Sequence, residues 1–206
     1  MPIPIIIWGV ISGATLLGAG YSLFNLSKKK IYISALGPVS SGKTTFHNYL
    51  RKTKFEDGTI GHNDLKEIKI EIKDKKITLS KGKDISGTEQ AVKAYYKDEI
   101  NKSDLIFYFL DSKKMLVDKS YVEVNIGRLN FINKINKERH KNNRAKVIII
   151  ASHYDSVSHI NNARQKVWQK IEKIASEGGI QAPHFINLTD SSQLEKLKIK
   201  LFEDEK

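Results

Sequence analysis

The stretch GPVSSGKT, residues 37–44, combines residue types and a spacing that can hold phosphate groups. It matches the pattern G-x-x-x-x-G-K-[ST]. In such a loop, backbone N–H groups and the positive end of the next helix surround phosphate oxygens, the lysine reaches the β and γ phosphates, and the hydroxyl coordinates Mg²⁺. The sequence therefore predicts a nucleotide-binding loop, with a flexible Gly/Ser connector as the alternative. The residues predicted to hold the nucleotide are Gly37, Ser40, Ser41, Gly42, Lys43, Thr44 and Thr45.

This loop needs a strand before it and a helix after it, and the pattern of apolar residues predicts both. Short apolar runs alternate with longer amphipathic stretches along the chain, which is typical of crossover units and a mainly parallel sheet with helices on both faces. The expected strands are 31–36, 68–72, 77–80, 105–110, 147–152 and 184–188, and the expected helices are 43–51, 88–102, 121–141, 161–177 and 193–202.

One junction departs from this alternation. Only the polar residues Asp74, Lys75 and Lys76 separate the runs 68–72 and 77–80, which is too short for a crossover. These two strands should therefore pair antiparallel as a hairpin. The expected fold class is α/β, a P-loop NTPase domain with a six-stranded, mostly parallel sheet that contains one antiparallel strand.

The first 27 residues form a separate segment. They contain no Asp, Glu, Lys or Arg, and the apolar stretch is about long enough for a helix to cross a hydrocarbon layer of ~30 Å. Lys28–Lys30 follow directly, as the positive-inside tendency expects for a cytoplasmic domain downstream. We therefore expect an anchor at 1–27 and a nucleotide-binding domain at 28–206, with residues 2–26 in the lipid. A cleaved signal and a buried core helix are the alternatives.

The charge of the chain bears on its partners. Its 35 Lys and Arg against 23 Asp and Glu give a formal charge of +12. A basic domain tethered beside an anionic leaflet gains favourable energy from each nearby cation, so lipid accounts for the charge, and no nucleic-acid-binding signature is present. The absence of Cys excludes a disulfide scaffold and a thiolate zinc site.

Four short stretches follow the loop in a fixed order: TIG from Thr59, DISG at 84–87, SHYD at 152–155 and TDS from Thr189. With the loop, they resemble the small P-loop GTPase superfamily, most closely the Arf-like branch and the beta subunit of the signal recognition particle receptor. The resemblance covers residues 31 to about 204 and implies a G domain, although several of the motifs are degenerate.

The resemblance implies roles around the terminal phosphate. Thr59 resembles the switch I threonine that senses Mg²⁺ and the γ phosphate. Asp84 resembles the aspartate that holds a Mg²⁺-bound water, and Gly87 the glycine whose N–H reaches the γ phosphate. The predicted metal ligands are thus Thr44, Thr59 and Asp84. Asp111, at the end of the apolar run LIFYFLD, is a rival carboxylate that would favour an ATPase-like site.

The resemblance also predicts slow hydrolysis. Thr88 stands where hydrolytically competent relatives carry a glutamine that orients the attacking water, and a threonine hydroxyl is too short to span the same distance. Val39 occupies a loop position where many relatives have glycine. The predicted catalytic residues are Lys43, Thr59, Gly87 and Thr88.

Base recognition is expected from the last two motifs. SHYD stands where the family has N-K-x-D, so the resemblance assigns Ser152, His153 and Asp155 to the base. The Asp155 carboxylate can accept two hydrogen bonds from guanine, which adenine cannot donate. Thr189 is the residue that corresponds to the S-A-K motif. A polar turn after the strand is the alternative interpretation of SHYD.

The sequence therefore predicts a membrane-anchored, small GTPase-like protein that binds GTP or GDP with Mg²⁺. It would act as a switch or docking partner, with a protein partner or activating protein that supplies an arginine, and nucleic acid is not expected. Two alternatives remain open: a GTP-binding interaction protein that does not hydrolyse, and an ATP-utilising membrane protein. The expected membrane is a bacterial inner membrane or the endoplasmic reticulum.

Overall fold

The computed structural model describes residues 30–52, 62–72, 75–80 and 82–203. Within these ranges, a six-stranded sheet has the strand order β3-β6-β2-β7-β8-β9. Every neighbouring pair in it is parallel except β3 and β6, which are antiparallel. Its strands are β2 (Ile33–Leu36), β3 (His62–Leu65), β6 (Gly82–Ile85), β7 (Leu105–Asp111), β8 (Lys146–Ser152) and β9 (His184–Phe185).

The centre of the sheet follows from its sequence. All seven residues of β7, LIFYFLD, are buried, and β7 lies between β2 and β8. A continuous apolar run is what a parallel strand covered on both faces requires. The carboxyl ends of β2, β7 and β8 consequently lie at one edge of the sheet, and their amino ends lie at the opposite edge.

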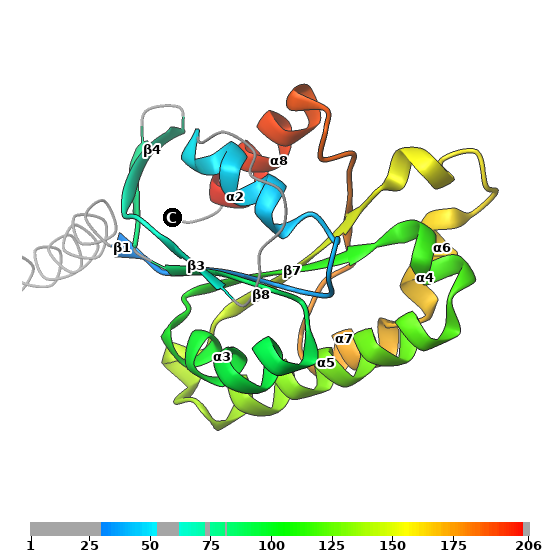
Figure 1. Ribbon diagram of the computed structural model, residues 1–206, viewed down its shortest axis with the longest axis horizontal. Coiled ribbons are helices and arrows are strands. Elements are labelled where there is room, and N and C mark those ends of the chain that lie inside the picture. Colours follow the sequence, from blue (N-terminus) through cyan, green and yellow to red (C-terminus); the bar gives the residue numbers. More distant parts are fainter. Residues whose placement is uncertain (1–29, 53–61, 73–74, 81, 204–206) are drawn as a thin grey trace, which may run out of the picture.

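Helices cover both faces of this sheet (Figure 1). On one face, α2 (Lys43–Arg51) and α8 (Ser191–Glu203) pack on the sheet with Phe46, Phe107 and Phe202 in the core. The other face carries α5 (Lys119–Glu138), the longest of the described helices, together with α3 (Glu89–Lys102) and α7 (Glu172–Glu177). The shorter helices are α4 (Ser112–Val117), η1 (Lys141–Asn143), η2 (Tyr154–Val157) and α6 (Ala163–Gln169).

The hairpin predicted around Asp74–Lys76 forms, but not in the six-stranded sheet. Its strands, β4 (Ile68–Ile72) and β5 (Lys75–Leu79), pair antiparallel and join β1 (Lys30–Ile31) in a separate three-stranded sheet of order β1-β5-β4. The placement of these two strands was therefore wrong.

A bend in the chain separates the two sheets. Tyr32 interrupts the strand path between β1 and β2, and corresponding breaks separate β4 from β3 and β5 from β6. Beyond the bend the hairpin curls over α2, where Ile70, Ile77 and Leu79 join the core around Phe46. The antiparallel strand of the large sheet is instead β3, whose sequence HNDL lacks the apolar alternation from which strands are predicted.

Two of the expected helices have different bounds in the structure. Instead of one helix from residue 121 to 141, α5 runs from 119 to 138, because Asp118 Oδ1 accepts a hydrogen bond from Tyr121 N at 2.9 Å and starts the helix earlier. The expected helix 161–177 is divided at Lys170–Ile171 into α6 and α7.

In the described ranges, no helix has the length and apolar composition to cross a membrane. The expected anchor at 1–27 lies outside the described residues.

Candidate functional site

The phosphate loop joins the end of β2 to the start of α2, as the sequence predicts. Gly37 and Gly42 have φ angles of 144° and 96°, which only glycine adopts without strain. A Cβ on Gly37 would lie 2.2 Å from Phe109 O, and one on Gly42 would lie 2.1 Å from Leu188 Cδ1. The loop therefore requires both glycines. Their φ angles suit glycine, and a side chain at either position would collide with Phe109 of β7 or with Leu188.

Lys43 folds back over this loop. Its Nζ donates hydrogen bonds to Gly37 O at 3.0 Å and Pro38 O at 2.7 Å, and the side chain is buried. Burial lowers the pKa of Lys43 to about 8, against the opposing effect of Asp84, while the nearby Arg128 lowers it further. A bound phosphate would favour the charged form, because an anion at this distance stabilises an ammonium group.

Thr44 and Asp84 come together from separate elements. Thr44 Oγ1, in the first turn of α2, donates a hydrogen bond to Asp84 Oδ2 of β6 at 2.7 Å, and Asp84 is buried. A hydroxyl and a carboxylate side by side are hard oxygen ligands of the kind Mg²⁺ prefers, with water and phosphate completing the shell. The residues therefore fit Mg²⁺, although the described part of the chain contains no group of three or more His, Cys, Asp or Glu able to hold a metal.

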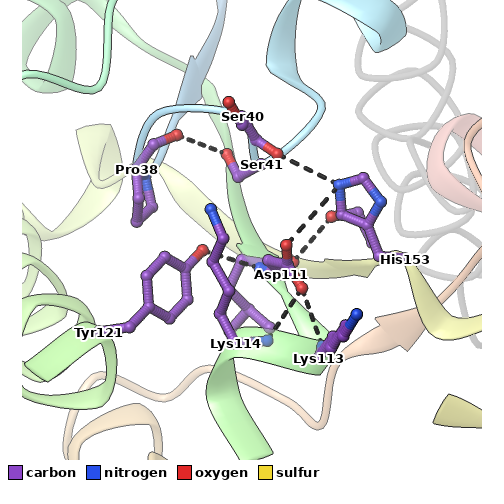
Figure 2. Close-up of polar contacts among 10 residues, drawn as sticks. Pro38, Ser40, Ser41, Asp111, Lys113, Lys114, Tyr121 and His153 are labelled. Carbon is purple, nitrogen blue, oxygen red and sulfur yellow. Dashed lines mark hydrogen bonds and ion pairs between the residues drawn. The ribbon is translucent and has the colours of Figure 1, made fainter. Parts of the chain in front are cut away.

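Asp111, the rival carboxylate, has a different role. Its Oδ1 accepts hydrogen bonds from Lys113 N at 2.8 Å and Lys114 N at 3.1 Å, so it caps α4. Its own N–H donates to the Tyr121 hydroxyl at 2.9 Å, as Figure 2 shows. The geometry thus favours Asp84 over Asp111 as a partner of Thr44.

The DISG segment lies directly on the phosphate loop. A Cβ on Gly87 would lie 2.2 Å from both Pro38 C and Val39 N, so no larger residue fits without moving the loop. The Gly87 carbonyl accepts a hydrogen bond from Arg128 Nη2 at 2.8 Å. Thr88 is exposed and caps α3, with its Oγ1 accepting from Ala91 N at 3.4 Å.

Two buried residues that support the loop were not predicted from the sequence. The Tyr96 hydroxyl accepts a hydrogen bond from Gly37 N at 2.8 Å and donates one to Gly37 O at 3.1 Å. Burial raises the pKa of Tyr96, so this hydroxyl stays neutral. Tyr96 and Arg128 sit in ordinary amphipathic helices, and nothing in their local sequence separates them from other core-facing residues.

The segment that the sequence predicts to contact the base begins at the end of β8. Ser152 is buried, and its Oγ donates a hydrogen bond to Leu110 O at 3.0 Å. His153 adopts a left-handed conformation and points back toward the phosphate loop, with Nε2 3.2 Å from Ser40 O and 3.9 Å from Asp111 Oδ2 (Figure 2). His153 therefore connects the SHYD segment to the phosphate loop.

The remaining predicted site residues form no hydrogen bond or ion pair with the phosphate loop in the described part of the chain, apart from Thr45, which follows the loop in α2. Asp155 is exposed in η2. Thr189 is exposed too, and both its N–H and its Oγ1 donate to Asn187 Oδ1, at 2.9 and 2.7 Å. Thr45, half-buried in α2, lines a hollow between α2, β4 and α8. Thr59 lies outside the described residues.

The remaining residues of the phosphate loop differ in their exposure. Ser41 is buried, and its Oγ donates to Pro38 O at 2.8 Å, which closes the loop on itself. Ser40 is exposed, with a φ of 59°. Val39, at 51% exposure, points away from the core.

Comparison with known proteins supports the fold. No family model and no curated protein matches the sequence. Among solved structures, Methanosarcina barkeri Roco2 RocCORdC bound to GDP is similar, with a TM-score of 0.57 and 20% sequence identity. The match covers 85% of this chain and 49% of that one, so this chain spans about half the length of its structural neighbour. The described domain has a P-loop GTPase-like fold.

Proposed function

We propose that this protein is a membrane-anchored GTPase-like protein that binds GTP or GDP together with Mg²⁺ and acts as a switch or docking partner. The observation that carries the proposal is the convergence of Lys43, the Thr44–Asp84 pair and Gly87 on one glycine-dependent loop. The GDP in the structural neighbour supports a guanine nucleotide as the ligand.

Each residue around the loop has a defined task in this proposal. Lys43 would exchange its contacts with the loop carbonyls for contacts with phosphate oxygens, and Gly87 N–H would donate to the terminal phosphate. Thr44 and Asp84 would hold Mg²⁺, whose charge offsets that of the phosphates. We expect Thr59 to join this group when nucleotide is bound. Once Lys43 has made this exchange, donors held in place around the loop would stabilise the charge that develops in a phosphoryl-transfer reaction.

On the base side, Asp155 would accept two hydrogen bonds from guanine. Ser152 and Thr189 would border the base, and His153 would hold this segment against the phosphate loop through Ser40. The exposure of Asp155 leaves its carboxylate accessible to a ligand. Because SHYD lacks the asparagine and lysine of the family motif, we expect only a moderate preference for guanine.

The test is to extract any nucleotide from the purified full chain in detergent and then to titrate it with fluorescent GDP. Competition with GTP and ATP in the presence of Mg²⁺ measures base preference. The proposal predicts that GTP displaces the probe at lower concentration than ATP. Lys43→Ala should abolish most of the binding, because it removes charge-assisted contacts worth roughly 1.5–3 kcal/mol each.

Two outcomes would contradict the proposal in different ways. If ATP competes better than GTP, the protein is an ATP-utilising membrane protein instead. If neither nucleotide displaces the probe, or Lys43→Ala binds as well as the wild type, the loop does not hold nucleotide.

A second candidate function is a GTP-binding interaction protein that does not hydrolyse its ligand. The observation in its favour is Thr88, which is engaged in capping α3 and has no side-chain amide to orient water. Single-turnover hydrolysis of pre-bound GTP by the full chain separates the two functions. Binding without turnover, both alone and with an added partner protein, would favour this second candidate.

A further inference from the structure

The edge of the sheet opposite the phosphate loop carries a dense group of cations. Around the amino ends of β7 and β8, five chain segments meet: the β1–β2 junction, the end of α3, the start of β7, the 137–144 segment and the start of β8. Their basic residues, which we name the basic edge, are Lys30, Lys102, Lys137, Arg139, Lys141, Arg144 and Lys146.

Hydrogen bonds to backbone carbonyls hold these segments together. Asp104 N donates to Tyr32 O at 2.9 Å, and Lys146 N donates to Asp104 O at 3.0 Å. Arg139 Nη1 donates to Ile100 O and Ser103 O, at 2.6 and 2.8 Å, which joins the end of α5 to the end of α3. The basic edge is therefore a fixed part of the folded domain and not a collection of independent loops.

The cations of this edge outnumber its acidic residues. Asp104 accepts the N–H of Tyr32 at 3.0 Å, Glu67 forms an ion pair with Lys30 at 2.8 Å, and Glu138 lies within the basic run. Lys102, Lys141 and Arg144 are exposed and form no ion pair within the described part of the chain. A hollow of about 570 Å³ opens here, lined in part by Arg139, His140, Arg144 and Lys146.

The proposed membrane anchor would determine what this edge faces. The described structure begins at Lys30, at the bend next to the basic edge, and residues 1–29 precede it. If residues 1–27 span a membrane, only Lys28–Lys30 separate the lipid from the domain, a reach of about 10 Å. That distance is close to the Debye length of about 8 Å at physiological ionic strength, so the cations of this edge nearest Lys30 would then feel the charge of the membrane surface.

We propose that the basic edge docks on anionic phospholipid headgroups of the membrane that holds the chain. This inference rests on the anchoring part of the proposed function. Docking at the amino ends of the strands would direct the phosphate loop away from the lipid, because the seven residues of β7 span about 23 Å between the two edges. The nucleotide site would then face a partner in solution.

The test uses the full chain inserted in phosphatidylcholine vesicles, with or without phosphatidylserine. Because the chain has no Cys, Asn142→Cys gives a single labelling site at the basic edge, and Ser156→Cys gives one at the nucleotide edge. Energy transfer to a headgroup-labelled lipid should rise with phosphatidylserine at Asn142→Cys and fall again in high salt. Transfer from Ser156→Cys should stay lower throughout.

A charge-reversal variant and a matched control identify the surface. Lys102→Glu/Lys141→Glu/Arg144→Glu should remove the effect of phosphatidylserine, since each cation near the surface contributes roughly a five-fold change in the docked-to-undocked ratio. The control, Lys166→Glu/Lys173→Glu/Lys196→Glu, reverses the same number of exposed charges elsewhere and should retain the effect. Circular dichroism and GDP binding check that both variants are folded.

Three outcomes would overturn the docking proposal. The first is that energy transfer from labelled Asn142→Cys does not change with phosphatidylserine, although the chain resists an alkaline wash and is therefore anchored. The second is an equal loss in the control variant. The third is capture of labelled RNA through the same three cations on phosphatidylcholine vesicles, which would make nucleic acid the occupant. A chain washed off the vesicles overturns the anchoring instead, and failed GDP binding alone affects only the nucleotide part of the proposed function.

Discussion

The phosphate side of the candidate site, around Lys43 and Asp84, and the proposed base side, around Asp155 and Thr189, differ in burial and in hydrogen bonding. Lys43 and Asp84 are at least 95% buried. Tyr96 and Ser41 form hydrogen bonds within the loop from the core, and Arg128 donates to the carbonyl of Gly87, which packs on the loop. Asp155 and Thr189 are exposed, and the two hydrogen bonds that Thr189 forms among the described residues join it to Asn187 in its own turn.

If the domain binds a nucleotide as proposed, this difference indicates which part of it the site would recognise. Buried groups such as Asp84 and Tyr96 are already ordered before phosphates bind, although Lys43 must exchange its contacts with the loop carbonyls. Exposed groups must be ordered at a cost of roughly 0.5–1.5 kcal/mol for each side chain. We therefore expect phosphate and Mg²⁺ contacts to supply most of the affinity, and base contacts to supply a smaller preference.

The largest expected effect comes from Gly87→Ala. The new methyl group would meet backbone atoms of Pro38 and Val39, which cannot rotate aside, so a cost of about 3 kcal/mol is expected, equivalent to ~100-fold weaker GDP binding. The matched control is Gly127→Ala in α5, where nothing lies within 4 Å of the added carbon. Titration with fluorescent GDP measures both, and equal affinities for the two variants would contradict the packing of Gly87 on the loop.

The second-largest expected effect is a loss of folding stability in acid, caused by His47 beside the phosphate loop. Burial lowers the pKa of His47 to about 4, with Arg51 and Lys43 adding to the effect and Asp84 opposing it. Below its ordinary pKa of about 6.5, the unfolded chain takes up a proton that the folded chain does not, so the free energy of unfolding falls by about 2–3 kcal/mol between pH 6.5 and pH 4.

Urea unfolding of the detergent-solubilised full chain at several pH values measures this loss. His47→Gln should remove most of the pH dependence in that window, while His159→Gln, at an exposed position, should retain it. A pH dependence unchanged by His47→Gln would show that another buried group is responsible.

Substitution of one carboxylate at a time compares the phosphate side with the base side directly. Asp84→Asn should raise the Mg²⁺ concentration needed for GTP binding about ten-fold, because it removes a charged ligand worth roughly 1.5 kcal/mol. Asp155→Asn should leave the Mg²⁺ requirement unchanged and reduce the preference for GTP over ATP. Metal titrations and nucleotide competition check these effects, and a base preference lost in Asp84→Asn instead would reverse the assignment.

The smallest expected effect concerns turnover. Thr88→Gln should increase single-turnover GTP hydrolysis several-fold by adding an amide that can orient water, while the lost helix cap costs about 1 kcal/mol of stability. Thr88→Ser keeps the cap and should hydrolyse at the wild-type rate. A rate for Thr88→Gln no higher than that of Thr88→Ser would mean that other features limit hydrolysis, such as Val39 in the loop.

The sequence by itself determined the features that depend on local spacing. The phosphate loop requires glycines at fixed positions before a helix, and β7 requires an unbroken apolar run, so both were predictable. The same patterns predicted the central parallel strands and the 68–79 hairpin.

Only the tertiary structure decided how distant segments meet. It pairs Thr44 with Asp84, assigns Asp111 to the cap of α4, and brings Arg128 onto the carbonyl of Gly87. It also bends the hairpin into a second sheet. These outcomes depend on packing between elements far apart in the chain, and packing leaves no periodic signal in the local sequence.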